Sequence, residues 1–157
     1  MDKKVLIISS SPRKGGNSET LAAAFGKGAR DAGNQVETVY LREKQVSFCK
    51  GCLACLKLGH CVIQDDAVEI AAKMHDANVL VFATPVYYYC VSGQLKTMLD
   101  RANPLFDTRT TPLQKPICLQ RRQRTHRRPL WAQRKPCRAG WIASLAVRWW
   151  AQCLQAA

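Results

Sequence analysis

The chain has 157 residues, which suits one α/β domain, and 47% of them are hydrophobic, as in an ordinary globular protein. Only residues 5–8 form an apolar run near the start, so the sequence predicts no export signal or membrane span, and we expect a cytoplasmic protein. The net charge of +13 is concentrated in residues 115–157, which contain ten Lys and Arg and no Asp or Glu. Residues 1–114 are nearly neutral and give no indication of a nucleic-acid surface.

Apolar runs alternate with helical patterns along residues 3–119. Strands are predicted at residues 3–8, 36–41, 79–83 and 116–119. Helices are predicted from Asn17 to a stop at Gly33, from the cap at Asp65 and Asp66 to Ala77, and from Ser92 to Ala102. In the first helix, small and apolar residues recur at helical spacing and are expected to face inward: Leu21, Ala24, Phe25, Gly28 and Ala29.

This alternation predicts the α/β class, with a doubly wound parallel sheet that carries helices on both faces. Ligands of such sheets bind at the carboxyl ends of the strands, where the strand order changes direction. Two predicted loops occupy that edge, residues 9–18 after the first strand and residues 84–93 after the third. We therefore expect them to form one site.

The first loop, Ser-Ser-Ser-Pro-Arg-Lys-Gly-Gly-Asn-Ser over residues 9–18, joins a buried strand to the start of a helix. Small residues allow backbone amides to approach an anion, the helix dipole favours negative charge, and Arg13 adds a charged donor. The loop is neither a Walker loop nor the glycine pattern of dinucleotide folds. It predicts a phosphate site, the alternative being a polar connection to a helix.

The second loop is aromatic and contains Tyr87, Tyr88 and Tyr89 in a row. A flat redox ring needs apolar and aromatic walls with backbone donors at its edge, and this loop offers both. Three consecutive tyrosines cannot all point inward, so one or two of them are expected to pack elsewhere.

As a pair, these loops resemble those of NADPH-dependent FMN reductases and iron-sulfur flavoproteins, a flavodoxin-like group, over residues 1–119. The resemblance implies an FMN-dependent oxidoreductase that takes electrons from NAD(P)H or a protein donor and passes them to a small acceptor or carrier. It implies that the FMN phosphate is held by Ser11, Arg13, Asn17 and Ser18. It places the flavin ring against Pro85, Val86, Tyr87, Tyr88, Ser92 and Gly93. No side chain is expected to act as a catalytic acid or base.

Four cysteines lie within thirteen residues, at Cys49, Cys52, Cys55 and Cys61. Four thiolates match the ligand set of a [4Fe-4S] cluster or of tetrahedral zinc, and free thiols or a redox disulfide are the other interpretations. The spacing resembles the cluster motif of iron-sulfur flavoproteins, which implies a [4Fe-4S] cluster as a second redox centre. No Ser/His/Asp grouping or pair of carboxylates indicates hydrolysis.

Residues 120–157 do not continue the resemblance. We therefore divide the chain into a flavodoxin-like FMN-binding domain, residues 1–119, and a basic tail, residues 120–157, which we expect to be disordered or derived from a frameshift. The alternative function, nucleic-acid binding, depends on arginines of this tail: Arg121, Arg122, Arg124, Arg127 and Arg128. The expected partners are a small or protein redox partner and, for a complete fold, further copies of the chain. A membrane partner is not expected.

The tail lacks the fifth apolar strand that the resemblance requires. We interpret it as the product of a frameshift, because an arginine- and tryptophan-rich stretch without acid is typical of GC-rich DNA read out of frame. When each codon starts on the third base of the previous one, the codons for Trp149, Trp150 and Ala151 encode Val-Gly. A genuine basic tail and a solvated helix over residues 142–151 are the alternatives.

Overall fold

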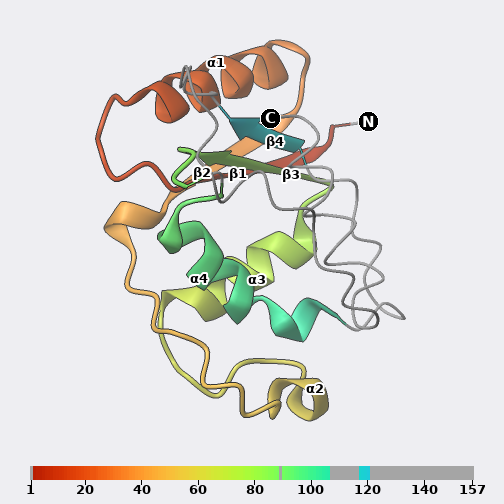
Figure 1. The fold of residues 1–157 in the computed structure, drawn as a ribbon. Helices are drawn as coiled ribbons and strands as arrows, with labels where there is room; N and C mark the ends of the chain where they lie inside the picture. Colours follow the sequence, from red (N-terminus) through yellow and green to blue (C-terminus); the bar gives the residue numbers. More distant parts are fainter. Residues whose placement is uncertain (1, 89, 107–116, 121–157) are drawn as a thin grey trace, which may run out of the picture. The chain divides into compact units, whose positions relative to one another are not determined.

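A computed structural model describes residues 2–88, 90–106 and 117–120, all of which lie in one compact unit (Figure 1). Four parallel strands form its sheet: β1 (Lys4–Ser9), β2 (Gln35–Tyr40), β3 (Val79–Thr84) and β4 (Ile117–Gln120). Their order is β2-β1-β3-β4, so β1 and β3 are neighbours in the middle of the sheet. The chain leaves β1 toward β2 and leaves β3 toward β4. The loops that follow β1 and β3 therefore meet at the predicted change of direction.

Helices cover both faces of this sheet, as the sequence predicts. Figure 1 shows α1 (Asn17–Asp31) on one face, with α3 (Asp66–Asp76) and α4 (Gly93–Arg101) on the other. Two 3₁₀ turns, η1 (Leu41–Glu43) and η2 (Asn103–Phe106), follow β2 and α4. The doubly wound α/β fold is thus confirmed over the four strands that the structure describes.

The core beneath α1 depends on a close approach between helix and sheet. Val5, Ile7 and Val81 point from the strands toward buried Ala22 of α1. Gly26 lies on the same side, where an added Cβ would come within 3.1 Å of Ile7 Cδ1. Glycine at this position allows the helix to lie directly on β1.

On the opposite face, the other set of alternating strand residues is buried. It packs with the apolar sides of α3 and α4, which include Ile70, Met74, Leu95 and Met98. Both faces of β1 and β3 are therefore buried, which is why these strands read as continuous apolar runs.

The structure also departs from the sequence predictions. Leu21, Ala24 and Gly28 were predicted to face inward but are exposed, and Ala22 and Gly26 are the buried residues of α1 on that side. A short helix that the sequence did not predict, α2 (Cys55–Leu58), lies in the segment that carries the four cysteines. The predicted fifth strand and the basic tail fall outside the described residues. Within the described part of the chain, no helix is both long and apolar enough to span a membrane.

Candidate functional site

The two loops predicted to share a site are joined at the carboxyl ends of β1 and β3. Ser92 Oγ donates a hydrogen bond of 2.8 Å to Ser10 Oγ, and both side chains are buried. The backbone N–H of Ser10 also donates to the carbonyl of Ala83 at 2.9 Å. Since residues 10 and 92 lie far apart in the sequence, this contact fixes one loop against the other.

Thr84 closes the base of the second loop. Its Oγ1 accepts a hydrogen bond from Ser92 N at 3.1 Å and donates one to the carbonyl of Pro85 at 3.1 Å. Ser92 Oγ accepts from Leu95 N at 3.4 Å and thereby caps α4, as the sequence predicts. Ser92 is fully buried and acts here as a structural link between the loops, although the resemblance implied that it lies beside the flavin ring.

The start of α1 is open in a way that the starts of α3 and α4 are not. Asp65 caps α3 and Ser92 caps α4 through their side chains, whereas Gly16 precedes α1 without any side-chain cap. The backbone N–H groups of Asn17, Ser18 and Glu19 donate no hydrogen bond to any other described residue. Unpaired N–H groups at the positive end of a helix dipole form a binding site for an anion.

Contacts within the first loop keep this helix start accessible. Ser11 Oγ donates to the carbonyl of Arg13 at 2.9 Å. A Cβ at Gly16 would come within 2.9 Å of Ser11 Oγ and within 3.2 Å of the Arg13 carbonyl oxygen. Glu19 accepts from Gly15 N at 2.8 Å and pairs with Arg42 at 3.1 Å. The loop is therefore pinned from α1 and from the end of β2, and its tight turn requires glycine at position 16.

The four residues predicted to bind the phosphate lie on this loop and on the first turn of α1. Ser11 and Ser18 are buried, whereas Arg13 and Asn17 are exposed. Ser18 Oγ makes no hydrogen bond to another described residue. The fold thus brings the four residues together around the open end of α1.

The predicted ring loop makes a tight turn at the same edge of the sheet. The N–H and carbonyl groups of Tyr87 and Cys90 are paired at 3.0 Å in both directions. Tyr88 is 90% exposed and has a φ of 48°, a left-handed conformation that is strained for an aromatic residue. Pro85 and Val86 are half-buried, and Gly93 is exposed as the first residue of α4. Tyr89 lies outside the described residues.

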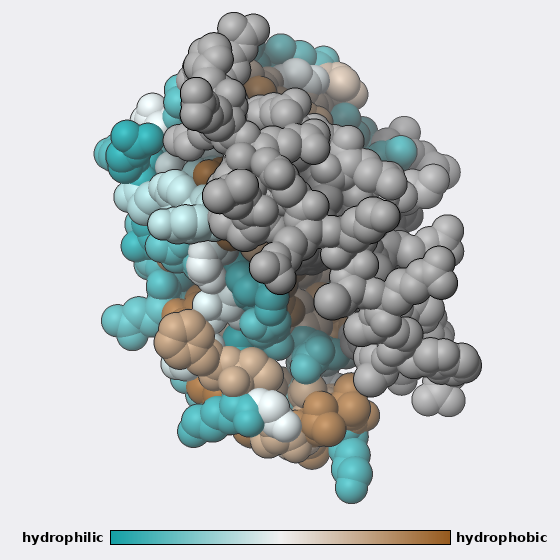
Figure 2. Space-filling view, viewed as in Figure 1, coloured by the Kyte–Doolittle hydropathy of each residue, from teal (hydrophilic) through white to brown (hydrophobic). Residues whose placement is uncertain are grey.

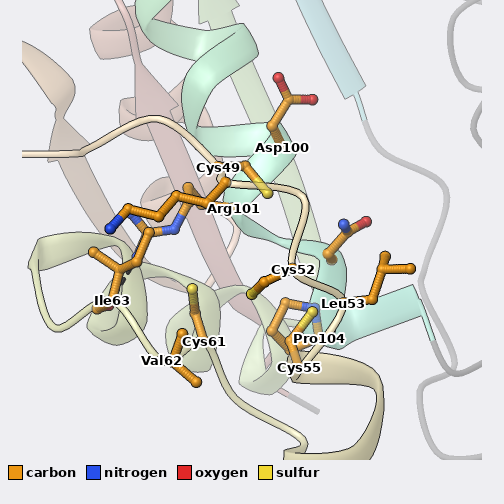
Figure 3. A pocket seen from close by; sticks show the side chains of 12 residues that line it. Cys49, Cys52, Leu53, Cys55, Cys61, Val62, Ile63, Asp100, Arg101 and Pro104 are labelled. Atoms are coloured by element: carbon orange, nitrogen blue, oxygen red, sulfur yellow. Dashed lines mark hydrogen bonds between the residues drawn. The ribbon is translucent and has the colours of Figure 1, made fainter.

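The cysteines gather around a separate pocket. Cys49, Cys52, Cys55 and Cys61 all line it, together with residues from the end of α4 and from η2 (Figure 3). Cys55 is buried, and its pKa is raised by burial and, to a smaller extent, by the three other thiols. Within the described part of the chain, no group of three or more His, Cys, Asp and Glu residues is gathered closely enough to hold a metal ion.

One buried ion pair closes the loop that carries these cysteines. Arg101 forms a bidentate ion pair with Asp65. Its NH1 donates to Oδ2 at 2.7 Å and its NH2 donates to Oδ1 at 2.9 Å. NH1 also donates to the carbonyl of Ser47 at 2.9 Å, and NH2 to that of Ile63 at 2.9 Å. Residues 47 and 63 flank the cysteine segment. Arg101 therefore joins the two ends of this segment to α4.

The carboxylate of Asp65 is stabilised in its charged form. Burial acts to raise its pKa, but hydrogen bonds from Arg101 and from the backbone of Ser47 and Ala67 outweigh burial and lower the pKa to about 2. The ionised group thus supports the folded state above the unfolded pKa of 3.8, and this support is lost as the pH falls toward 2.

This pKa predicts acid sensitivity. The free energy of unfolding should decrease by about 2 kcal/mol between about pH 5 and pH 2 on account of Asp65 alone. Urea unfolding of the wild type and of Asp65→Asn over this range measures the contribution. The pH dependence should be shallower in the variant, and equal slopes would contradict the assignment.

Comparison with known proteins adds to this geometry. Residues 3–121 match the family model for NADPH-dependent FMN reductase. The chain belongs to the NADPH-dependent FMN reductase family. The match includes both loops, the cysteine segment and β4.

Curated relatives of this family member include iron-sulfur flavoproteins. One from Archaeoglobus fulgidus is 38% identical over 101 residues, which are 64% of this chain and 46% of that protein. Another from Methanosarcina thermophila is 40% identical over 99 residues, 63% of this chain and 52% of that protein. The chain thus spans about half the length of these relatives.

A solved structure supports the fold of this family member independently. The NAD(P)H:quinone oxidoreductase from Methanothermobacter marburgensis superposes with a TM-score of 0.64 at 21% identity. The superposition covers 76% of this chain and 64% of that one. At this level of identity the likeness concerns the flavodoxin-like fold alone.

Several residues that build the site were not predicted as site residues. Ser10 links the two loops, Glu19 and Arg42 hold the loop after β1, and Arg101 closes the cysteine segment. The sequence carried one signal for Arg101, because it follows Leu95 and Met98 at a spacing of three residues on the buried side of α4. A charged residue that continues an apolar stripe must find a buried partner.

Proposed function

We propose that this chain is an FMN-dependent oxidoreductase that receives electrons from NAD(P)H or a protein donor. The observation that carries the proposal is the open start of α1, which is held beside the second loop by the contact between Ser92 and Ser10. Membership of the NADPH-dependent FMN reductase family supports it. The family match gives no support to the nucleic-acid alternative, whose arginines lie outside the described residues.

The residues present fit FMN. A phosphate dianion at the start of α1 would accept from backbone N–H groups that have no other partner among the described residues, and from the hydroxyl of Ser18. The small residue at position 16 leaves room for such an anion, since a Cβ there would fill the turn. Arg13 is exposed beside the loop and would add a charge-assisted contact.

Bound FMN would supply the redox chemistry, accepting electrons from a donor and passing them on. The chain would bind the phosphate through the first loop and orient the ring through the second. The strained turn at Tyr88 presents an aromatic side chain at this edge of the sheet, where it would shield one side of the ring from water.

This assignment predicts a preference between flavins. FMN should bind the apoprotein roughly 100-fold or more tightly than riboflavin, because only FMN carries the phosphate that the start of α1 would hold. Fluorescence titration of the full-length apoprotein with each flavin measures the two dissociation constants. Equal affinities would remove the phosphate loop from the proposal.

We further propose that the cysteine pocket holds a [4Fe-4S] cluster. Four thiols line one pocket, and four thiolates are the donor set of such a cluster. The curated relatives described above are iron-sulfur flavoproteins. Cys49 and Cys52 are exposed, so ligation would draw them toward Cys55. Positive φ values at Gly51, Leu53 and Gly59 show where the loop turns around the pocket.

Reconstitution tests the cluster directly. Protein purified without oxygen and treated with iron and sulfide should contain both, and the Cys52→Ser/Cys55→Ser variant should retain neither. Cys90→Ser is the matched control, because Cys90 belongs to the other loop. Zinc in place of iron, or no metal in the wild type, would contradict the cluster.

The segment that carries the four cysteines also exposes an apolar surface. Large apolar side chains are exposed along it, at Phe48, Leu53, Leu56, Leu58 and Val62. Figure 2 shows apolar side chains gathered at the end of the molecule that carries α2. Exposed apolar groups at this density are typical of an interaction surface.

We propose that a frameshift produced the basic tail, residues 120–157, in place of the normal end of the domain. The family model ends at residue 121, and the remaining residues contain no acid. Sequencing of the locus tests this origin. A shifted frame that meets an early stop codon, or that encodes no apolar strand, would contradict it.

A further inference from the structure

The cysteine pocket receives one side chain from outside the cysteine segment that is both charged and fully buried. Arg101 projects from the last turn of α4 and lies beside Ile63 and Cys61 in Figure 3. Its NH1 and NH2 groups use their N–H bonds on Asp65, Ser47 and Ile63, as described above. The planar guanidinium thus spans both ends of the segment.

One donor of this guanidinium is left over. The Nε atom of Arg101 is buried and has no hydrogen-bond partner among the described residues. A buried N–H without an acceptor is costly, and such an atom calls for an explanation. Cys61 and Arg101 line the same pocket and lie beside each other in Figure 3, so a candidate sulfur ligand is near the guanidinium.

We propose that Arg101 is the positioning residue of the cysteine pocket: NH1 and NH2 close the base of the segment, and Nε donates a hydrogen bond to the metal-bound sulfur of Cys61. This inference rests on the proposed cysteine site. Donors behind a metal ligand orient it and tune the metal, and their loss costs roughly 10- to 100-fold in metal affinity.

Lysine cannot replace arginine in this role. A lysine at position 101 could reach Asp65 with a single ammonium group. It could not also span the carbonyls of Ser47 and Ile63 and retain a donor at the position of Nε. Arg101→Lys keeps the positive charge but removes the planar set of N–H donors. This variant therefore tests whether the geometry of the guanidinium, rather than its charge, is required.

The experiment is a cobalt(II) titration of the full-length protein, purified without oxygen and with its thiols reduced. Thiolate-to-cobalt absorption reports ligation by the cysteines without requiring cluster assembly. The variants are Arg101→Lys and Asp65→Asn, since asparagine still caps α3 but loses the charge that holds Arg101. Lys73→Gln is the control, because Lys73 pairs with Glu37 and Glu69 away from the pocket. FMN affinity is measured in each protein as a check on the rest of the fold.

We expect cobalt to bind Arg101→Lys roughly 10- to 100-fold more weakly than the wild type, with Asp65→Asn weakened in the same direction and Lys73→Gln unchanged. FMN affinity should stay within about twofold in all variants, since the flavin loops do not contact Arg101. Wild-type cobalt affinity in Arg101→Lys would overturn the proposal, and so would an equal loss of FMN affinity.

If Arg101→Lys does not fold, wild-type cobalt affinity in Asp65→Asn would overturn the proposal. Absence of thiolate-to-cobalt absorption in the wild type would overturn the cysteine site and this inference together, and would leave the FMN assignment standing.

Discussion

Replacing Arg13 and Ser18 together by alanine is expected to weaken FMN binding roughly 100-fold, because each of the two substitutions would remove a hydrogen bond to the charged phosphate. Ser18 lies buried in the first turn of α1 with its hydroxyl unused within the described structure, and Arg13 is exposed beside it. Riboflavin affinity should change little, since riboflavin lacks the phosphate. The measurement is the dissociation constant of each flavin for the double variant.

Arg30→Ala is the matched control for this prediction. Arg30 is an exposed arginine in the last turn of the same helix, far from its open start. Its removal should leave FMN affinity unchanged. FMN binding of wild-type strength in the double variant would show that the phosphate lies elsewhere.

Replacing Arg101 by methionine is expected to destabilise the protein by about 3–5 kcal/mol, because it leaves the carboxylate of Asp65 buried without its charged partner. The same change removes the contacts to Ser47 and Ile63 that close the cysteine segment. Chemical unfolding followed by circular dichroism measures the loss. We expect Asp65→Asn in the Arg101→Met background to recover part of it, since the unpaired charge disappears.

Lys73→Met provides the comparison. Lys73 forms exposed ion pairs with Glu37 and Glu69, and pairs of this kind contribute about 0–1 kcal/mol. If Arg101→Met lowers the free energy of unfolding by no more than Lys73→Met does, the ion pair between Arg101 and Asp65 does not stabilise the fold in the way that its burial indicates.

The order of elements could be predicted from the sequence because the physical signals are local. Strands buried on both faces appear as continuous apolar runs, and the caps at Asp65 and Ser92 announce the helices that follow them. The position of the two loops at one edge then follows from the handedness of the connections. The fold class and the family were therefore within reach of the sequence.

Contacts between distant segments were not predictable in the same way. The inward face of α1 was misassigned at Leu21, because close packing against Ile7 selects Gly26 and Ala22 over a larger side chain. The link between Ser10 and Ser92 and the closure of the cysteine segment by Arg101 join residues that no local pattern connects. Tertiary packing, rather than propensity, decides which polar side chains become structural and which stay free for a ligand.

The flavin content of the purified protein tests the central proposal most directly. The full-length chain, incubated with FMN and then freed of excess, should be yellow, and denaturation should release FMN that was held non-covalently. A colourless protein that takes up no FMN, with its α/β fold intact by circular dichroism, would contradict the proposed function.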